Sequence, residues 1–358
     1  MRGQRALLYF FKDRIGLCLT VPGVNGTMRV KRKAAAQYSG MLDGEFVDAS
    51  ELPSIVLRLV HEVLEGIAVE AVLVEAPAMF CSVSTAGAHE KFSPAKKLTD
   101  KDIEEFQAKR NGNTVAGMQE IYRDVMFYKL DGGQPTLSIE GKTVSDLYAK
   151  QSIIHTSDHF MHAIQNAFAG TQLKNLRYVS TELARAKYFV PESSRDVGCA
   201  FISCDMFSTS LAVAVGDGLA DLYTVNAGYA HVLSDLTEVL ECDHGAAEDL
   251  LDGVILSLDV EDDDIFTVGE FEYNAREVTE IIRCRLDEIA EELGKVLAER
   301  ESPDKPVQLY FGGAHIPKIN GARDAFAKAL GRHVRLALCP LTHAVEGEDI
   351  KVQAMLDM

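Results

Sequence analysis

Hydrophobic and polar positions along the chain follow two periods, and together they predict an α/β architecture. Short apolar runs over 6–11 and 71–75 predict buried strands. Apolar residues at helical spacing predict an amphipathic helix over 52–64 and a long one over 275–297. Further strands are expected over 15–21, 26–34, 175–180, 198–204, 211–215, 219–225, 307–311 and 334–338, and further helices over 157–168, 182–189, 246–256 and 322–330. This alternation of elements favours α/β over the other fold classes.

A more polar stretch, 84–153, interrupts this pattern with a small α/β pattern of its own. Thr99 to Asp102 resembles a capping box at the start of a helix, with Asp in place of the usual Glu or Gln. Asp131-Gly132-Gly133, between the runs 124–129 and 135–139, is a hairpin-turn signal. We therefore expect an inserted subdomain here.

Length and composition narrow the class of protein. A chain of 358 residues is long enough for two domains. With 47% hydrophobic and 25% charged residues it is neither disordered nor collagen-like. No apolar run reaches the roughly 18 residues of a membrane-spanning helix, and residues 1–19 lack a signal-peptide cleavage site. Seven cysteines without a C-x-x-C pair predict a reduced, cytoplasmic protein.

The formal net charge of −18 is concentrated in one segment. Residues 241–304 hold 21 acidic and 5 basic side chains, whereas the first 33 residues hold eight basic and one acidic. Such a balance excludes a nucleic-acid partner, because phosphate binding requires clustered Lys and Arg. The basic N-terminal segment could make a weak electrostatic contact with anionic lipid or with an acidic partner.

Two turns at strand ends are candidates for ligand binding. Residues 312–317 begin with two glycines where a strand is followed by a helix. The glycines would let a ligand approach the backbone closely, and the helix N-terminus would supply free N–H groups. Asp205, followed by a turn with Ser and Thr, offers groups for a hydrated metal ion and a phosphate. The structural alternatives are a tight strand-to-helix turn at 312–317 and a polar hairpin turn at 205–210. The lack of glycines at 205–210 favours the hairpin turn there.

Three histidines have a spacing found among metal ligands. His155, His159 and His162 lie at i, i+4 and i+7, which would place them on one helix face. No Glu follows the first His, and no cysteine nearby completes a site. A solvated or subdomain-facing helix is the preferred interpretation.

Taken in order, several segments resemble the FtsA branch of the actin-like ATPase superfamily. These segments are 40–48, 98–102, 128–132, 182–198, 226–235, 247–248, 281–289, 311–313 and 334–340. The resemblance implies an α/β, actin-like (ribonuclease-H-like) two-domain fold with an FtsA-type inserted subdomain. It divides the chain into a first domain (1–83 and 154–195), the insertion (84–153), a second-domain core (196–240 and 305–358) and an acidic outer subdomain (241–304).

The resemblance also implies a site for ATP with Mg²⁺. The cofactor-binding residues that it implies are Asp205, Ser208, Thr209, Gly228, Glu248, Gly312, Gly313 and Ala314. Asp205 would hold the metal ion, and in an active enzyme Asp235 would orient the attacking water.

The phosphate end of this site departs from the family pattern. The first phosphate loop, which begins D-x-G in the family, is Tyr9-Phe10-Phe11 here, and the glycines of the second are replaced or deleted, leaving residues 207–209. The Lys expected three residues after Glu248 is Leu251. Because phosphate cradling needs backbone N–H groups without a Cβ in the way, the sequence predicts a degenerate site and a pseudo-ATPase.

The leading hypothesis is an FtsA-like scaffold of bacterial cell division, in the cytoplasm at the division site or the inner face of the membrane. It would bind FtsZ-like or other divisome proteins and self-associate. One alternative is an active ATPase of the same fold, and another is a PilM-like adaptor, a type that binds a short peptide of a membrane partner in a groove between subdomains. A sugar kinase is disfavoured by the place of the insertion. The chain stops at Met358 without the membrane-binding helix of FtsA, so membrane contact is expected to be indirect or weak.

Overall fold

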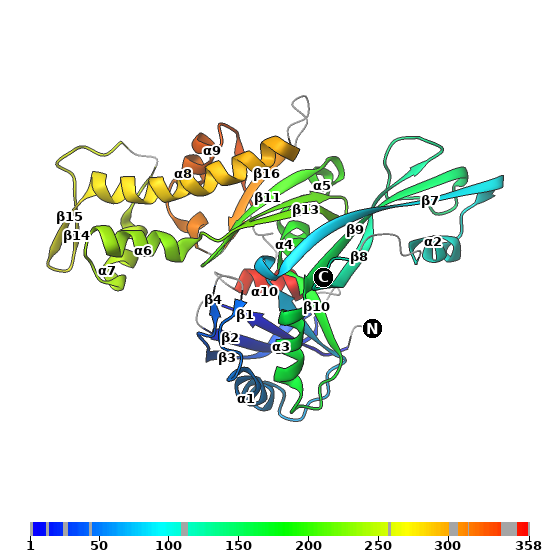
Figure 1. The fold of residues 1–358 in the computed structure, drawn as a ribbon, viewed down its shortest axis with the longest axis horizontal. Helices are drawn as coiled ribbons and strands as arrows, with labels where there is room; N and C mark the ends of the chain where they lie inside the picture. The colour runs from blue at the N-terminus through cyan, green and yellow to red at the C-terminus, as the bar shows by residue number, and fades with distance from the viewer. Residues whose placement is uncertain are drawn as a thin grey trace. The chain divides into compact units, whose positions relative to one another are not determined.

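The fold consists of two compact units (Figure 1). The computed structural model describes residues 3–11, 14–23, 28–42, 45–108, 114–256, 259–300, 307–313, 315–337 and 349–356. Unit one comprises Met1–Cys199, Ala212–Leu222 and Cys339–Met358, and unit two comprises Ala200–Leu211 and Tyr223–Leu338. Asp43, Gly44, Ala314 and residues 338–340, which belong to predicted motifs, lie outside the described residues.

Unit one is built on a five-stranded mixed sheet of order β10-β6-β1-β2-β3. Its strands are β1 (Arg5–Phe10), β2 (Arg14–Pro22), β3 (Met28–Gln37), β6 (Ala71–Ala76) and β10 (Leu176–Ser180), as the apolar runs predict. β1 pairs antiparallel with β2 and parallel with β6, and β6 pairs parallel with β10. β1 and β6 are buried on both faces, and this indicates a sheet covered on both sides.

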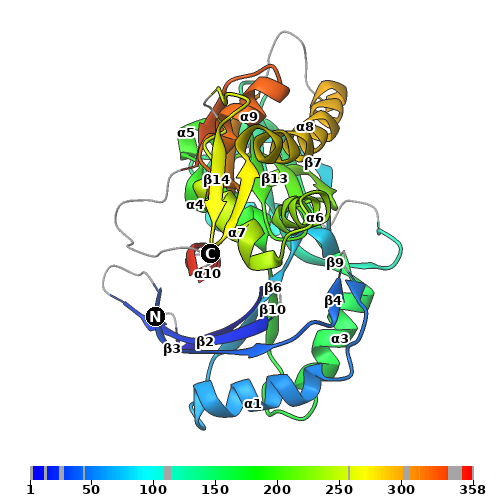
Figure 2. The same cartoon turned by 90° about the vertical axis from the view of Figure 1, so that its left-hand side faces the viewer.

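Helices cover both faces of this sheet. Those of unit one outside the insertion are α1 (Leu52–Leu64), α3 (Asp158–Phe168), α4 (Thr181–Phe189), α5 (Glu192–Val197) and α10 (Asp349–Leu356). In Figure 2, α1 lies below the sheet and α10 lies above it, and α3 packs against α1. The short pieces β4 (Met41–Leu42), β5 (Glu45–Phe46) and η2 (Ala78–Phe80) complete the connections.

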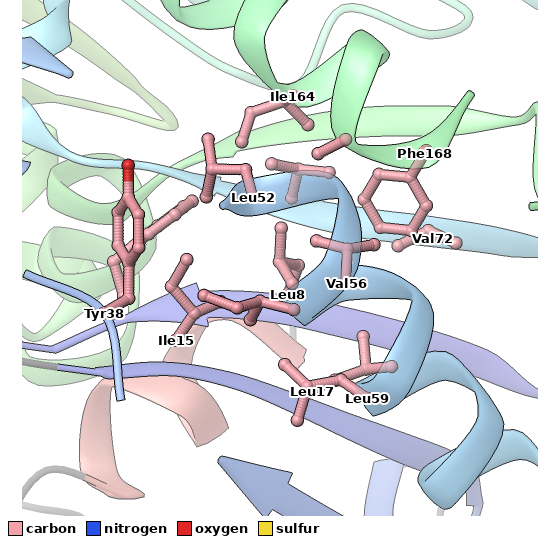
Figure 3. Close-up of a cluster of buried hydrophobic side chains, with 14 of the residues drawn as sticks. Leu8, Ile15, Leu17, Tyr38, Leu52, Val56, Leu59, Val72, Ile164 and Phe168 are labelled. Carbon is pink, nitrogen blue, oxygen red and sulfur yellow. The ribbon is translucent and has the colours of Figure 1, made fainter. Parts of the chain in front are cut away.

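The core between the sheet and α1 follows from the helical spacing of α1. Its buried residues include Leu52, Val56 and Leu59, which pack on side chains of β1 and β2 such as Leu8 and Ile15 (Figure 3). The helix ends where the residue after it, Glu65, adopts the left-handed conformation and donates its N–H to the His61 carbonyl. The boundaries match the predicted helix.

The polar stretch of the sequence forms a second sheet in unit one, of order β7-β9-β8. Its strands are β7 (Cys81–Lys97), β8 (Met118–Leu130) and β9 (Thr143–Ser157), and α2 (Asp100–Gln107) packs on it. The capping box is confirmed: Thr99 N–H donates to Asp102 Oδ2 over 3.0 Å, and Asp102 N–H donates to Thr99 Oγ1 over 3.4 Å. A separate small core, with Phe106 and Leu147 among its buried members, makes this sheet a unit of packing in its own right.

Residues 212–222 join unit one through this second sheet. Ser152 Oγ donates to the Leu219 carbonyl over 2.7 Å and accepts from the Leu219 N–H over 3.0 Å. The Arg195 guanidinium donates to the Gly216 carbonyl over 3.1 Å. A Cβ at Gly216 would lie 2.1 Å from the Met126 carbonyl oxygen, so this tight hairpin tip requires glycine.

Unit two contains most of a second five-stranded sheet, of order β13-β12-β11-β16-β17. The strands are β11 (Cys199–Cys204), β12 (Thr209–Val215), β13 (Gly218–Val225), β16 (Gln308–Gly313) and β17 (Val334–Leu336). The helices are α6 (Tyr229–Val239), α7 (His244–Gly253), α8 (Ala275–Arg300), α9 (Ala322–Ala329) and the short η3 (Ile316–Lys318). An exposed hairpin, β14 (Ile265–Val268) with β15 (Phe271–Asn274), precedes the long helix α8 (Figure 1). Within the described ranges, no helix is both long enough and apolar enough to span a bilayer.

Candidate nucleotide site

Three segments of unit two that are far apart in the sequence meet at the end of its sheet. They are the turn 205–208 after β11, the start of α6 and the end of β16. A Cβ at Gly228 would lie 2.5 Å from the Asp205 carbonyl oxygen and 2.8 Å from the Ser208 nitrogen. Thr209 Oγ1 donates to the Ala227 carbonyl over 2.8 Å. The structure therefore brings the predicted residues of the first two segments into direct contact.

The two glycines of β16 are explained by protein packing. Gly313 has φ +124°, and a Cβ there would lie 2.2 Å from the Cys204 carbonyl oxygen. A Cβ at Gly312 would lie 2.8 Å from the Phe201 ring. β16 thus approaches β11 too closely for any side chain at these positions, and this accounts for both glycines without a ligand.

The first backbone N–H groups of α6 are bonded within the protein. Tyr229 N–H donates to the Asp205 carbonyl over 3.0 Å, and Ala230 N–H donates to the Met206 carbonyl over 2.8 Å. Gly228 N–H donates to His231 Nδ1 over 3.1 Å. In a phosphate site at a helix N-terminus, such groups point at the anion. Here they hold the 205–208 turn against the helix.

Aromatic rings connect the start of α6 to the residues after β16. The Tyr229 ring stacks on the His315 ring with centroids 5.1 Å apart and an interplanar angle of 30°. Burial first, and then the carboxylates of Asp252 and Glu248, raise the pKa of Tyr229 to about 12. Glu248 also lies 3.4 Å from His244 Nε2 on α7. The predicted residue Glu248 therefore belongs to the surroundings of Tyr229.

Asp235 joins two helices. Its Oδ2 accepts from Arg285 Nε over 2.7 Å and its Oδ1 accepts from Arg285 Nη2 over 2.8 Å. This two-point pair links α6 to α8 and raises the pKa of Arg285. Both oxygens of a carboxylate that would have to orient water are thus bound by a guanidinium.

In unit one, residues 9–11 occupy the position of the first phosphate loop, and a side-chain carboxylate is hydrogen-bonded to their backbone. The Phe10 N–H donates to Glu75 Oε2 over 2.7 Å, and Thr181 Oγ1 donates to Glu75 Oε1 over 3.0 Å. Glu75 is buried, and so is Tyr9, whose ring would lie 2.3 Å from a Cβ at Gly16. A buried carboxylate at this amide would repel a phosphate group. Glu75 was not predicted, and its only signal in the sequence is that it is the one acidic residue in the apolar run 71–76.

The predicted helical arrangement of histidines is wrong. His155 lies near the end of strand β9 and is buried, whereas His159 and His162 lie on α3. Each of the residues 153–156 pairs with β7 on one side and with β8 on the other, so the sheet, and not a helical spacing, determines their geometry. Among the residues that can be described, no group of three or more His, Cys, Asp and Glu is arranged to hold a metal ion.

Comparisons by sequence find no relative: no protein-family profile and no curated protein matches the chain. Comparisons by structure find many. A PilM–PilN type IV pilus biogenesis complex is similar with a TM-score of 0.59 and 15% identity, over 98% of this chain and 95% of the other. MreB5 of Spiroplasma citri bound to AMPPNP is similar with a TM-score of 0.57 and 9% identity, over 99% of this chain and 95% of the other. The ethanolamine utilization protein EutJ from Carboxydothermus hydrogenoformans is similar with a TM-score of 0.53 and 13% identity, over 99% of this chain and 89% of the other.

The chain has the actin-like ATPase fold. This confirms the predicted α/β, actin-like fold. At 9–15% identity the likeness reaches no further than the fold. The FtsA branch, the partner and the chemistry of the site therefore rest on the residues themselves.

Proposed function

We propose that this chain is a scaffold with the actin-like fold that works by binding other proteins and has weak or absent ATP hydrolysis. The observation that carries the proposal is that backbone N–H groups that would bind phosphate in a nucleotide site are already hydrogen-bonded within the protein. Those of Tyr229 and Ala230 are bonded to carbonyls of the 205–208 turn, and that of Phe10 is bonded to the Glu75 carboxylate. The residues of each unit, taken separately, do not fit a triphosphate with Mg²⁺. In unit two its oxygens would have to displace the bonds at the start of α6, and in unit one they would have to displace the bond of the Phe10 N–H and lie beside a buried carboxylate.

Isothermal titration calorimetry with ATP and Mg²⁺ tests this proposal. We expect no saturable heat at micromolar protein and nucleotide concentrations, because the amides are already bonded. Phosphate release should equal the background rate and should not change in the Asp205→Ala variant. Micromolar binding would show that the site is not degenerate, and phosphate release that Asp205→Ala abolishes would show an active ATPase in place of a scaffold.

For the partner, we propose FtsZ-like or other divisome proteins, with self-association of the chain. The support is the order of FtsA-like segments along the sequence and the inserted β7-β9-β8 sheet with α2, which has its own core. The sites of action that fit this proposal are the division site and the inner face of the membrane.

A second candidate, a PilM-like adaptor, is favoured by a groove in unit one. The groove has a volume of about 780 Å³ and is bordered by β8 and β10, each of which is the edge strand of its sheet. Apolar side chains such as Ile121 and Leu176 line it together with Arg5, Lys174 and Arg177. Edge strands beside apolar pockets are suited to an extended peptide. In the similar complex, PilM is assembled with PilN.

Binding of labelled peptides separates the two candidates. A peptide from the FtsZ tail and overlapping peptides of PilN would be titrated into the full chain and followed by fluorescence anisotropy. If the adaptor proposal holds, a PilN peptide binds and Arg177→Ala weakens it, whereas Arg58→Ala, an equally charged change on the exposed face of α1, does not. Binding of the FtsZ peptide alone would favour the division scaffold.

A further inference from the structure

A second groove lies in unit two, and the proposed function does not use it. One side is formed by residues 239–243, at the end of α6 and in the connection to α7. The other side is formed by residues 271–274 of β15 and by Glu277 at the start of α8. Its volume is about 610 Å³. We refer to it as the outer-lobe groove.

Apolar side chains are exposed in and beside this groove. Phe271 is 68% exposed and Val239 is 55% exposed, and both line it. Phe271 is the only aromatic residue among the large hydrophobic side chains that are exposed in the described part of the chain. A clustered group of this kind marks an interaction surface, and an aromatic residue is a frequent anchor of one.

Carboxylates surround these apolar side chains. Four of the residues that line the groove are acidic: Glu241, Asp243, Glu272 and Glu277. None of the lining residues is Lys or Arg. Asp243 also caps α7, accepting from the Ala246 N–H over 2.9 Å. The segment 241–304, to which these residues belong, carries a net charge of −16 from 21 acidic and 5 basic side chains. The field over the groove therefore attracts cations.

We propose that the outer-lobe groove binds a cationic, amphipathic segment of a partner protein. Its apolar side chains would pack on Phe271 and Val239, and its Lys or Arg side chains would pair with the surrounding carboxylates. A second copy of this chain is the other occupant that the experiment below separates from such a partner. The inference is independent of the state of the nucleotide site.

A designed peptide serves as the probe. It is fluorescein-labelled and has leucine on one helical face and lysine on the other, and anisotropy is measured with the full chain at low and at physiological salt. We expect saturable binding that weakens as salt rises. Two comparison peptides, one with every lysine replaced by glutamate and one with every leucine replaced by serine, should not bind. Equal binding of the serine peptide would overturn the proposal, since it would reduce the effect to charge alone.

Matched variants locate the binding. Phe271→Ser should weaken it by about tenfold, as the loss of an interface anchor typically does. Leu57→Ser is the control, because Leu57 is 51% exposed on α1 in the other unit and its loss should leave binding unchanged. A triple Glu→Gln variant at 241, 272 and 277 should weaken binding, whereas the same change at the exposed positions 280, 291 and 299 should do so much less.

Two further outcomes would overturn the proposal. If both triple variants weaken the peptide equally, the whole acidic lobe attracts cations and the groove has no part in recognition. If sedimentation shows that the chain forms dimers without peptide, and Phe271→Ser disperses them, then the occupant is a second copy of this chain.

Discussion

Replacing Phe160 with alanine is expected to lower the free energy of unfolding of unit one by about 3–5 kcal/mol, the usual cost of truncating a buried phenylalanine. Phe160 is fully buried on α3. Its ring centroid lies 4.5 Å from that of Phe80, 5.7 Å from that of Phe46 and 5.8 Å from that of Phe10. These four rings come from four different elements, so the cavity left by alanine cannot be filled by a local adjustment.

Urea unfolding followed by far-UV circular dichroism measures this effect, because the chain has no tryptophan for fluorescence. Phe271→Ala is the control: its ring is 68% exposed, and a surface change of this kind alters stability by less than about 0.5 kcal/mol. A Phe160→Ala variant that unfolds at the same urea concentration as the control would mean that the four rings do not form one packed cluster.

Elements that depend on local sequence could be predicted, whereas elements that depend on contacts with distant parts of the chain could not. The helix α1 could be predicted to the residue, because its apolar spacing is local and the chain reverses at Glu65. α6 was missed. Its first N–H groups are bonded to the carbonyls of Asp205 and Met206, which are more than twenty residues away, and Gly228 gives no side-chain cap. A helix that begins on a tertiary contact leaves no start signal in its own sequence.

The long strands of the insertion were hidden for a similar reason. β7 has 17 residues, and of these only Ala86 and Ala88 are buried, so the run offers few large apolar side chains to predict a strand. It is a strand because it pairs along most of its length with β9, about sixty residues further on. The exposed β14–β15 hairpin has no buried position at all, and the acidic residues before it give the pattern of a loop.

The contact between the unit-two segments of the candidate site could be predicted from the sequence, whereas the bonds of its other segment could not. The sequence predicted that Asp205, Gly228 and Gly313 belong to one site, and the structure places their segments in contact. It also predicted that the phosphate end is poor. The hydrogen bond between the Phe10 N–H and the Glu75 carboxylate could not be predicted. The two residues are 65 positions apart, and their contact depends on the register between β1 and β6.

The second large effect is expected at a buried ion pair on α4. Arg185 Nη1 lies 2.9 Å from Glu182 Oε1, and the two side chains are 3% and 1% exposed. Replacing Arg185 with methionine, which keeps most of the side-chain volume, should lower the free energy of unfolding by about 3–5 kcal/mol, because it leaves the Glu182 carboxylate buried without this guanidinium.

A double-mutant cycle separates the charge from the packing. Glu182→Gln combined with Arg185→Met removes both charges, and it should recover a substantial part of the stability that Arg185→Met alone loses. If the two losses simply add, the pair does not interact and the assignment is wrong.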